Sequence, residues 1–530
     1  MPDLTLPDSN DSNGPRSLGR RLSMPIFLVV IGVGIIYCVT HLMHDLESVQ
    51  QSSILPYLLL GVALMIALGF EFVNGFHDTA NAVATVIYTH SLAPNLAVVW
   101  SGIWNFAGVL VSSGAVAFGI LQLLPVELIL GVGSSQGFAM VFALLIAAII
   151  WNLGTWALGI PSSSSHTLIG SVIGVGLMNQ MMHGPSGTSG VDWGQALAVG
   201  KSLLFSPLVG FILAGLLLYV MKLVVRVPAL YKEPKKNTPP PFWIRCLLIL
   251  TCTGVSFAHG SNDGQKGMGL IMLILIGTVP TAYALNRAMH EADVGAFVAV
   301  SAQAQTALGH YAAGPAPADP HAAAVDIVRT RSVSPQTLPA IVALSQSVAQ
   351  RVDTYHSLAK VPPAATVNIR NDMYLISEGL RFVGKSPQIS LSRADRKTLG
   401  EYKQQLDNAT KFIPTWVKVA VAVALGLGTM IGWKRIVVTV GERIGKTHLT
   451  YAQGASAEVV AMLTIGAADA YGLPVSTTHV LSSGVAGTMV ANRSGLQWAT
   501  VRNLAMAWVL TLPVSIVLAG GLYWLLRTLL

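Results

Sequence analysis

Residues 54–78 have the sequence ILPYLLLGVALMIALGFEFVNGFHD, in which an apolar run is followed by a short polar motif. The apolar part is long enough to cross a lipid bilayer as a helix. The polar end, NGFHD at 74–78, reappears as HGSND at 259–263 within a second apolar stretch. Because polar groups inside a membrane span are costly, a polar motif that occurs twice predicts a duplicated binding site.

The composition indicates a membrane protein. Hydrophobic residues make up 52% of the 530 residues and charged residues only 11%, with a mean hydropathy of +0.60. This is too apolar for an ordinary soluble domain. We therefore expect an all-α polytopic membrane protein, because helices satisfy their own backbone groups in lipid. Apolar runs of spanning length occur at 25–41, 54–73, 96–124, 137–157, 203–225, 244–282, 413–433, 450–470 and 501–529.

The net charge of +8 comes from Lys and Arg in short segments beside the apolar runs, such as 222–245 and 434–446. Such a distribution follows the positive-inside rule and does not indicate nucleic-acid binding. The cysteines Cys38, Cys246 and Cys252 lack the spacing of a disulfide framework or a zinc site. The first 24 residues carry arginines ahead of an apolar stretch, but no convincing cleavage site follows Cys38, so we expect an uncleaved first helix with a cytoplasmic N-terminus.

A second motif is also duplicated: GIPSSSSH at 159–166 reappears as GLPVSTTH at 472–479. Proline and glycine break a helix, and hydroxyls with freed N–H groups can bind an anion at a half-helix N-terminus. A tetrahedral oxyanion fits such donors. We expect His166 and His479 to support the two hairpins, as an alternative to carrying protons. The predicted anion-binding hydroxyls are those of Ser163, Ser164, Ser165, Ser476, Thr477 and Thr478.

The order of the motifs predicts two inverted repeats of five elements each, with broken helices and re-entrant Ser/Thr hairpins, plus an extra N-terminal helix. Gly75 and Gly260 are expected to break the helices that carry the Asp motifs. The motifs lie farther apart in the second half, and the polar segment 283–412 accounts for the excess as one insertion on the outer face. The predicted divisions are 1–53 (tail and first helix), 54–225 (first repeat), 226–245 (basic cytoplasmic linker), 246–282 (start of the second repeat), 283–412 (insert, periplasmic) and 413–530 (rest of the second repeat).

Asp78 and Asp263 are the main candidates for cation or proton coupling, since intramembrane carboxylates are usually functional. The two copies differ: His77 corresponds to Asn262, and Asn81 corresponds to Lys266. At this position one half has a titratable imidazole and the other a neutral amide, an asymmetry that suits proton coupling. Two carboxylates beside an anion would repel it unless a proton or a metal cation intervenes. Glu458, which also lies in an apolar context, is a further candidate for a cation or proton site.

Other readings of these motifs are open. A membrane-embedded serine hydrolase would need one activated serine, whereas the hydroxyls form duplicated runs and no GxSxG motif is present. Helix capping could explain one Ser/Thr run but is a poor explanation for both. Sulfate or another oxyanion remains an alternative substrate. No nucleotide-binding motif is present, which disfavours an ATP-driven pump.

At EFVNGFHDTANAVAT (71–85) and AHGSNDGQKG (258–267) the chain resembles the inorganic phosphate transporter (Pit) family, in particular its bacterial low-affinity branch. The resemblance extends over 151–174, 426–433 and 471–489 and covers both repeats. It implies a secondary symporter in the bacterial inner membrane, not an enzyme. It further implies import of phosphate driven by protons, often as a neutral complex with a divalent metal such as Mg, Ca or Zn.

The resemblance also implies roles for individual residues. The family's ligand-binding residues match Asp78, Asn81, Asn262 and Asp263, together with the hydroxyl runs. Of these we assign Asn81 and Asn262 to phosphate and Asp78 and Asp263 to the coupled cation or a metal. Many sodium-coupled members have Asn at the position of His77 and a carboxylate near that of Asn105. This chain differs from them at both positions, which favours protons over sodium as the coupling ion. Glu458 does match a carboxylate of sodium-coupled relatives, and a sodium contribution stays open. We expect a homodimer in lipid, without a resident cofactor.

Overall fold

The computed structural model describes residues 18–47, 55–184, 188–234 and 238–529. For 18–27, 55–56, 79–81 and 291 it describes the backbone alone. The predicted tail up to residue 17, the end of the first predicted division at 48–53, and 235–237 of the predicted basic linker lie outside the described residues.

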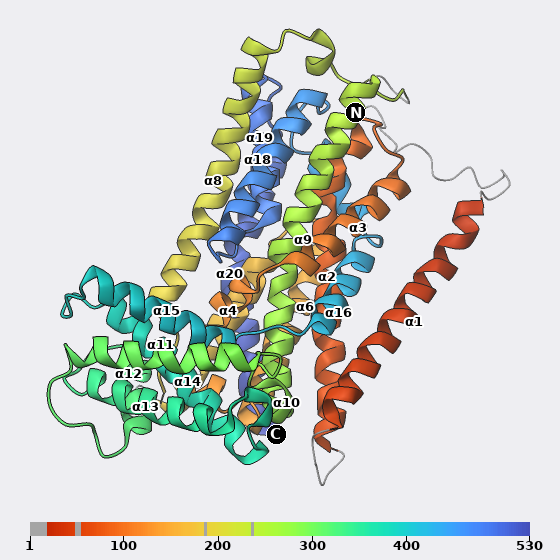
Figure 1. Cartoon of the computed structure of the whole chain (residues 1–530). Helices are drawn as coiled ribbons and strands as arrows, with labels where there is room; N and C mark the ends of the chain where they lie inside the picture. Colours follow the sequence, from red (N-terminus) through yellow and green to blue (C-terminus); the bar gives the residue numbers. More distant parts are fainter. Residues whose placement is uncertain (1–17, 48–54, 185–187, 235–237, 530) are drawn as a thin grey trace.

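Twenty α-helices make up the described chain, joined by turns and two short 3₁₀ helices (Figure 1). Seven of the described helices are long and apolar enough to cross a membrane, or eight if the bent pair α15 (Arg393–Thr410) and α16 (Thr415–Gly428) forms one span. The structure is therefore all-helical with multiple candidate spans, as the sequence predicts. The seven are α1 (Leu18–Leu46), α2 (Leu55–Tyr88), α3 (Pro94–Val111), α6 (Ser135–Ala157), α8 (Trp193–Val224), α9 (Phe242–Thr278) and α20 (Trp498–Leu529).

Two helical hairpins carry the Ser/Thr motifs: α6 with α7 (Ser164–His183), and α18 (Tyr451–Ala470) with α19 (Thr477–Ala491). Each turn contains a left-handed glycine, Gly159 at φ +67° and Gly472 at φ +65°. In both turns the residue after this glycine donates its N–H back to the preceding helix, Ile160 to Thr155 at 3.0 Å and Leu473 to Ala468 at 2.9 Å. The two hairpins therefore turn in the same way.

Helix contacts are exchanged between the two halves of the chain. Helix α7 packs on α20, while α19 packs on α8; α3 packs on α9, while α16 (Thr415–Gly428) packs on α2. Glycines allow main chains to approach at these crossings, since a Cβ at Gly174 would collide with Ile516 and one at Gly487 with Phe211. Each hairpin thus lies against the last long helix of the other half.

The helices that carry the Asp motifs are not broken, contrary to the prediction. Helix α2 runs without interruption through 74–78, and α9 through 259–263. Both glycines serve close helix packing instead: a Cβ at Gly75 would collide with the carbonyl of Leu425, and one at Gly260 with that of Asn105. The backbone needs no break because the polar side chains of these motifs reach partners on neighbouring helices.

Two predicted spans are interrupted. The run 96–124 is divided between α3, which ends at Val111, and α4 (Ala115–Leu121), which begins after the left-handed Gly114 at φ +87°; α5 (Val126–Leu130) follows this run. The run 413–433 likewise yields only the 14-residue α16 before α17 (Lys434–Glu442).

The insert 283–412 forms a separate group of helices at one end of the long helices (Figure 1). It is fastened to the residues before α8. Arg381 Nη2 lies 3.0 Å from Asp192 Oδ2, and Arg331 donates to the carbonyls of Val191 and Gly190 at 2.8 and 2.9 Å. Its helices, with the short α10 that precedes them, are α10 (Pro280–Tyr283), α11 (Glu291–Gly309), α12 (Pro320–Thr330), α13 (Thr337–Tyr355), α14 (Pro363–Lys385) and α15 (Arg393–Thr410).

The basic segments gather at the end opposite the insert, where α8 and α9 are joined through η1 (Pro228–Tyr231) (Figure 1). Arg245 donates to the carbonyl of Ser91 at 2.7 Å, and Gly445 pairs with Leu496 in an isolated bridge. The described chain therefore has the α8–α9 connection at one end and the insert at the other.

Candidate functional site

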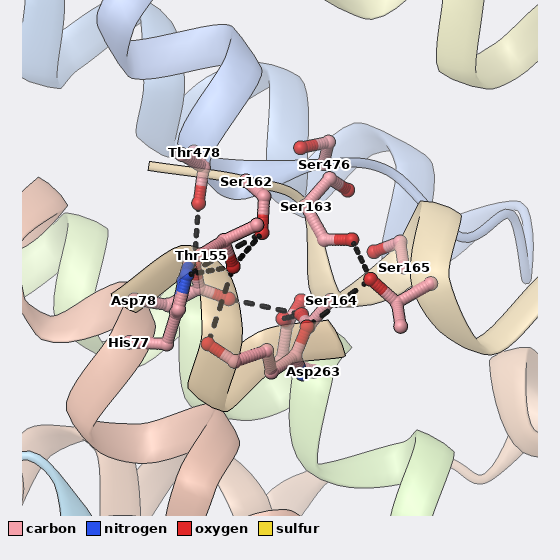
Figure 2. Close-up of polar contacts among 12 residues, drawn as sticks. His77, Asp78, Thr155, Ser162, Ser163, Ser164, Ser165, Asp263, Ser476 and Thr478 are labelled. Carbon is pink, nitrogen blue, oxygen red and sulfur yellow. Dashed lines mark hydrogen bonds and ion pairs between the residues drawn. The ribbon is translucent and has the colours of Figure 1, made fainter. Parts of the chain in front are cut away.

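The two Asp motifs and the two Ser/Thr motifs meet in the interior of the helical bundle. Ser164, at the start of α7, donates its hydroxyl to Asp78 Oδ2 at 2.9 Å and to Asp263 Oδ2 at 3.3 Å. Thr478 of α19 donates to the other oxygen of Asp78. All four side chains are buried. Figure 2 shows Ser164 between the two carboxylates, so one residue from each motif copy contributes to a single site.

His259 of α9 completes what we term the carboxylate cluster, Asp78, His259 and Asp263. Its Nε2 lies 3.8 Å from Asp78 Oδ2 and 3.5 Å from Asp263 Oδ2. Its Nδ1 lies 2.7 Å from Oδ1 of Asn105, and the amide nitrogen of Asn105 donates to Ser101. Nδ1 therefore carries a hydrogen, and Nε2 is the ring nitrogen that faces the two carboxylates. One ligand atom from each cluster residue lies within 4.8 Å of the others, an arrangement that can hold a metal cation.

The surroundings of the two carboxylates differ. Lys266 Nζ lies 2.7 Å from Asp263 Oδ2, and both side chains are buried. Asp78 has no lysine partner among the described residues; His77 lies beside it, with Nδ1 3.6 Å from Oδ1. His77 also contacts Thr155 Oγ1 at 3.2 Å and Ser162 Oγ at 3.4 Å through Nε2 (Figure 2). One carboxylate is thus neutralised by a fixed cation and the other is not.

A further buried carboxylate lies on the lysine side of the cluster. Glu71 accepts from Asn74 Nδ2 at 3.4 Å and is fully buried. It fits against α9 only because residue 267 is glycine, since a Cβ at Gly267 would collide with the Glu71 side chain.

The first residue of each predicted anion-binding run caps a helix. Ser163 accepts from the N–H of His166 and Ser476 from that of His479, both at 3.1 Å. Capping therefore explains Ser163 and Ser476, because both hairpins restart a helix after a proline turn, but it does not explain the runs as a whole, since Ser164 and Thr478 donate to Asp78. Ser165 links the hairpins by donating to the carbonyl of Val475 at 2.6 Å.

Two predicted phosphate ligands keep an unused polar atom. Thr477 Oγ1 is buried without a hydrogen-bond partner among the described residues. Asn262 donates to the carbonyl of Leu473 at 3.2 Å, while its Oδ1 has no such partner in the described chain. The helical position of Asn81 lies in α2, but its side chain falls outside the described residues.

The hairpin histidines lie against each other. The rings of His166 and His479 are 4.6 Å apart, and His479 stacks on Trp508 at 4.2 Å. Their predicted supporting role remains a prediction. Glu458 is not brought into the carboxylate cluster; it is buried in α18 and accepts a hydrogen bond from Thr251 of α9.

Sequence reasoning missed the role of His259. Its spacing of four residues from Asp263 places both on one face of α9, and this signal was present in the sequence. Asn105 lies in an apolar helix, which suggests an interhelical hydrogen bond, but its partner His259 is 154 residues away and no local pattern identifies it.

The chain was compared with known proteins. A model of the family described as the phosphate transporter family matches residues 74–519. The chain belongs to this family. The phosphate transporter family member from Escherichia coli K12 described as low-affinity inorganic phosphate transporter PitA is 43% identical, over 88% of this chain and 96% of its own. PitB of the same strain is 41% identical over the same shares. A solved structure described as the sodium-dependent phosphate transporter is 18% identical, with a TM-score of 0.48, over 89% of this chain and all of its own.

Membership in the phosphate transporter family confirms the predicted resemblance and the prediction of a multi-pass membrane transporter. It also decides against the alternative of a membrane-embedded serine hydrolase.

Proposed function

We propose that this protein imports inorganic phosphate across the bacterial inner membrane with low affinity, driven by protons, and that the transported species is a neutral complex of phosphate with a divalent metal. The names of the E. coli relatives support the phosphate substrate. The carboxylate cluster supports the metal and the proton.

The observation that carries the proposal is the close approach of His259 Nε2 to Asp78 and Asp263, at 3.8 and 3.5 Å. Two carboxylates that share one buried site repel each other unless a proton or a cation lies between them. A divalent metal accepts imidazole nitrogen and carboxylate oxygen together. Phosphate oxygens would complete its coordination, held by the hydroxyls of Ser164, Thr477 and Thr478.

Protonation is the second way to neutralise the carboxylates of the cluster. His77 lies beside Asp78, and the half with Lys266 carries a permanent cation instead. We infer that the Asp78 side of the site exchanges the coupling proton. Sodium coupling remains the second candidate, because buried Glu458 with the hydroxyl of Thr251 offers oxygen ligands apart from the cluster.

Alternating access would arise from two inverted repeats, 54–225 and 246–282 with 413–530. The exchanged packing of α7 on α20 and α19 on α8 supports this symmetry. In this arrangement both hairpins are re-entrant and meet at the midplane through Ser165 and Val475. The basic linker 226–245 would face the cytoplasm and the insert 283–412 the periplasm. The homodimer is still a prediction, and cross-linking in native membranes would test it.

The proposal is tested by uptake of labelled phosphate into proteoliposomes containing the full chain. We expect uptake that requires both a divalent metal and an inward proton gradient. Metal uptake should match phosphate uptake in labelled-metal assays. Uptake that persists in a metal chelator would contradict the metal complex. If a sodium gradient alone restores uptake, sodium and not the proton is the coupling ion. Inhibition by sulfate but not by arsenate would identify a different oxyanion as substrate.

A further inference from the structure

Arg370 of α14 is a buried cation without an acidic partner. Its side chain is 7% exposed, its Nη1 donates to Asn371 Oδ1 at 3.1 Å, and its guanidinium lies 5.4 Å from the ring of Tyr374. Its Nε has no hydrogen-bond partner among the described residues. Burial lowers the pKa of Arg370, and only Tyr374 opposes this. Since a buried charge without a counter-ion is costly, the site favours an anion.

The neighbouring cations of the same interface are already neutralised. Lys411 lies 2.8 Å from Asp407, and Arg381 lies 2.6 Å from Glu378 and 3.0 Å from Asp192. Within the described chain, Arg370 differs from both because no carboxylate lies within ion-pair distance of it.

Arg370 and Asn371 border a cavity of about 260 Å³ between the insert and the membrane helices. The opposite wall is the loop Gly131 to Ser134, and the remaining described wall is apolar, with Ile276 and Pro280 from the region where α9 ends. The described lining contains no acidic residue. The volume is far more than a single water needs, so a small anion with part of its hydration fits.

The loop wall leads directly into the N-terminus of α6, a helix of 23 residues. Ser134 caps it by accepting from the N–H of Gly137 at 3.3 Å and donates to the carbonyl of Gly131 at 2.6 Å. The first N–H groups of a helix lack intrahelical acceptors, and the helix dipole makes this end positive. The loop lies tightly on α9, since a Cβ at Gly133 would collide with the carbonyl of Gly277. Main chain therefore forms this part of the wall.

We propose that this cavity is a second anion site, which binds a phosphate group between the Arg370 guanidinium and the N-terminus of α6. A guanidinium and a helix N-terminus are the two protein groups that suit phosphate oxygens best. The site is separate from the carboxylate cluster, because the 23 residues of α6 place its two ends about 35 Å apart. It lies at the insert end of the molecule, where it would hold phosphate before transport.

The test is equilibrium binding of labelled inorganic phosphate to the purified full chain in detergent. Ser134→Asp keeps a good N-cap but adds a negative charge to the cavity wall, and Ser134→Asn is the neutral control with the same shape. Arg370→Gln removes the guanidinium, and Lys397→Gln removes an exposed cation of the insert as a charge control. Each variant is measured alone and in combination with Thr478→Val, which removes a hydroxyl of the proposed transport site.

We expect Ser134→Asp and Arg370→Gln to lose one class of phosphate sites in both backgrounds, while Ser134→Asn and Lys397→Gln keep it. Equal binding by Ser134→Asp and Ser134→Asn would overturn the site. If Thr478→Val leaves phosphate binding unchanged while Ser134→Asp removes one class of phosphate sites, the proposed transport site is contradicted and the second anion site is supported. Competition with short-chain phosphatidylglycerol separates the two sources of a phosphate group: displacement at lower concentrations than inorganic phosphate identifies a lipid headgroup, and the reverse identifies the free ion.

Discussion

Asn105 and His259 form a 2.7 Å hydrogen bond that fixes which ring nitrogen of the histidine faces the carboxylates. The bond joins α3 to α9 and sets the tautomer of a residue that we propose as a metal ligand. Partners of this kind orient metal-ligating histidines, and their loss costs 10–100-fold in metal affinity or activity.

Asn105→Leu is therefore expected to raise the metal concentration that gives half-maximal phosphate uptake by roughly 10–100-fold. The ring would no longer be held with Nε2 toward Asp78 and Asp263. Uptake into proteoliposomes across a metal titration measures the effect. Asn179→Leu, a buried amide that contacts Tyr523 instead, is the control. An equal shift in both variants would show that the effect is general destabilisation.

Ser164→Ala should impair phosphate uptake more than any other single hydroxyl in α7. Ser164 donates to both carboxylates, and buried acceptors that lose a donor cost about 1–3 kcal/mol, or roughly 5–150-fold in affinity. KM and kcat for phosphate are measured in proteoliposomes. Ser171→Ala is the matched control, because Ser171 is buried in the same helix but donates to the carbonyl of Thr167. Comparable losses in the two variants would contradict the bridging role.

Gly174→Ala and Gly487→Ala should each lower the unfolding temperature in detergent. A Cβ at either position meets the main chain of a long helix, and overpacking of this kind typically costs about 1–3 kcal/mol. Gly466→Ala in α18 is the control, since nothing lies within 4 Å of its Cβ position, and alanine favours the helix. The prediction is wrong if the three variants have the same unfolding temperature.

Asp192 should contribute stability at neutral pH that is lost in acid. Burial alone would raise its pKa, but the N–H of Gln195 and the side chain of Arg381 outweigh this and hold the pKa below its ordinary value. A lowered folded-state pKa gives stability above the unfolded value, about 3.9, and that stability disappears as the pH falls through the folded-state pKa.

Thermal unfolding between pH 7 and pH 3 tests this contribution. Asp192→Asn should be less stable than wild type at pH 7, and the difference should shrink below about pH 4. Asp326→Asn, which affects an exposed pair with Arg329, should change little at any pH. A pH-independent difference for Asp192→Asn would indicate that packing, not charge, fastens the insert.

Much of this arrangement could be predicted from the sequence, and the failures have physical causes. Duplicated motifs indicated that Asp78 and Asp263 belong to one site, and the structure brings them to one hydroxyl. The local glycines suggested broken helices at both Asp motifs, but glycine also serves close helix packing, and sequence alone does not distinguish the two uses. At Gly75 and Gly260, the choice depends on Leu425 and Asn105, which are remote in the chain.

The details of the site depended even more on tertiary contacts. The hydroxyls of each Ser/Thr run have different partners: Ser163 caps a helix, Ser164 reaches the carboxylates, and Ser165 joins the other hairpin. No local sequence pattern predicts which hydroxyl has which partner, because these neighbouring serines differ only in the direction in which each side chain points at the start of α7. The second anion site likewise depends on Arg370 facing a loop more than 200 residues earlier, at Gly131 to Ser134.

The glycine contacts between each hairpin and a long helix have a mechanical consequence. At Gly174 against Ile516 and at Gly487 against Phe211, main chain lies on main chain, and no side chain of the hairpin is interlocked there. Helices that meet in this way can slide along each other without rotamer changes, which is shear rather than hinge motion. Such sliding would have to break or carry along the hydrogen bond from Ser165 to Val475 at the hairpin tips and the one from Tyr523 to Asn179 between α20 and α7.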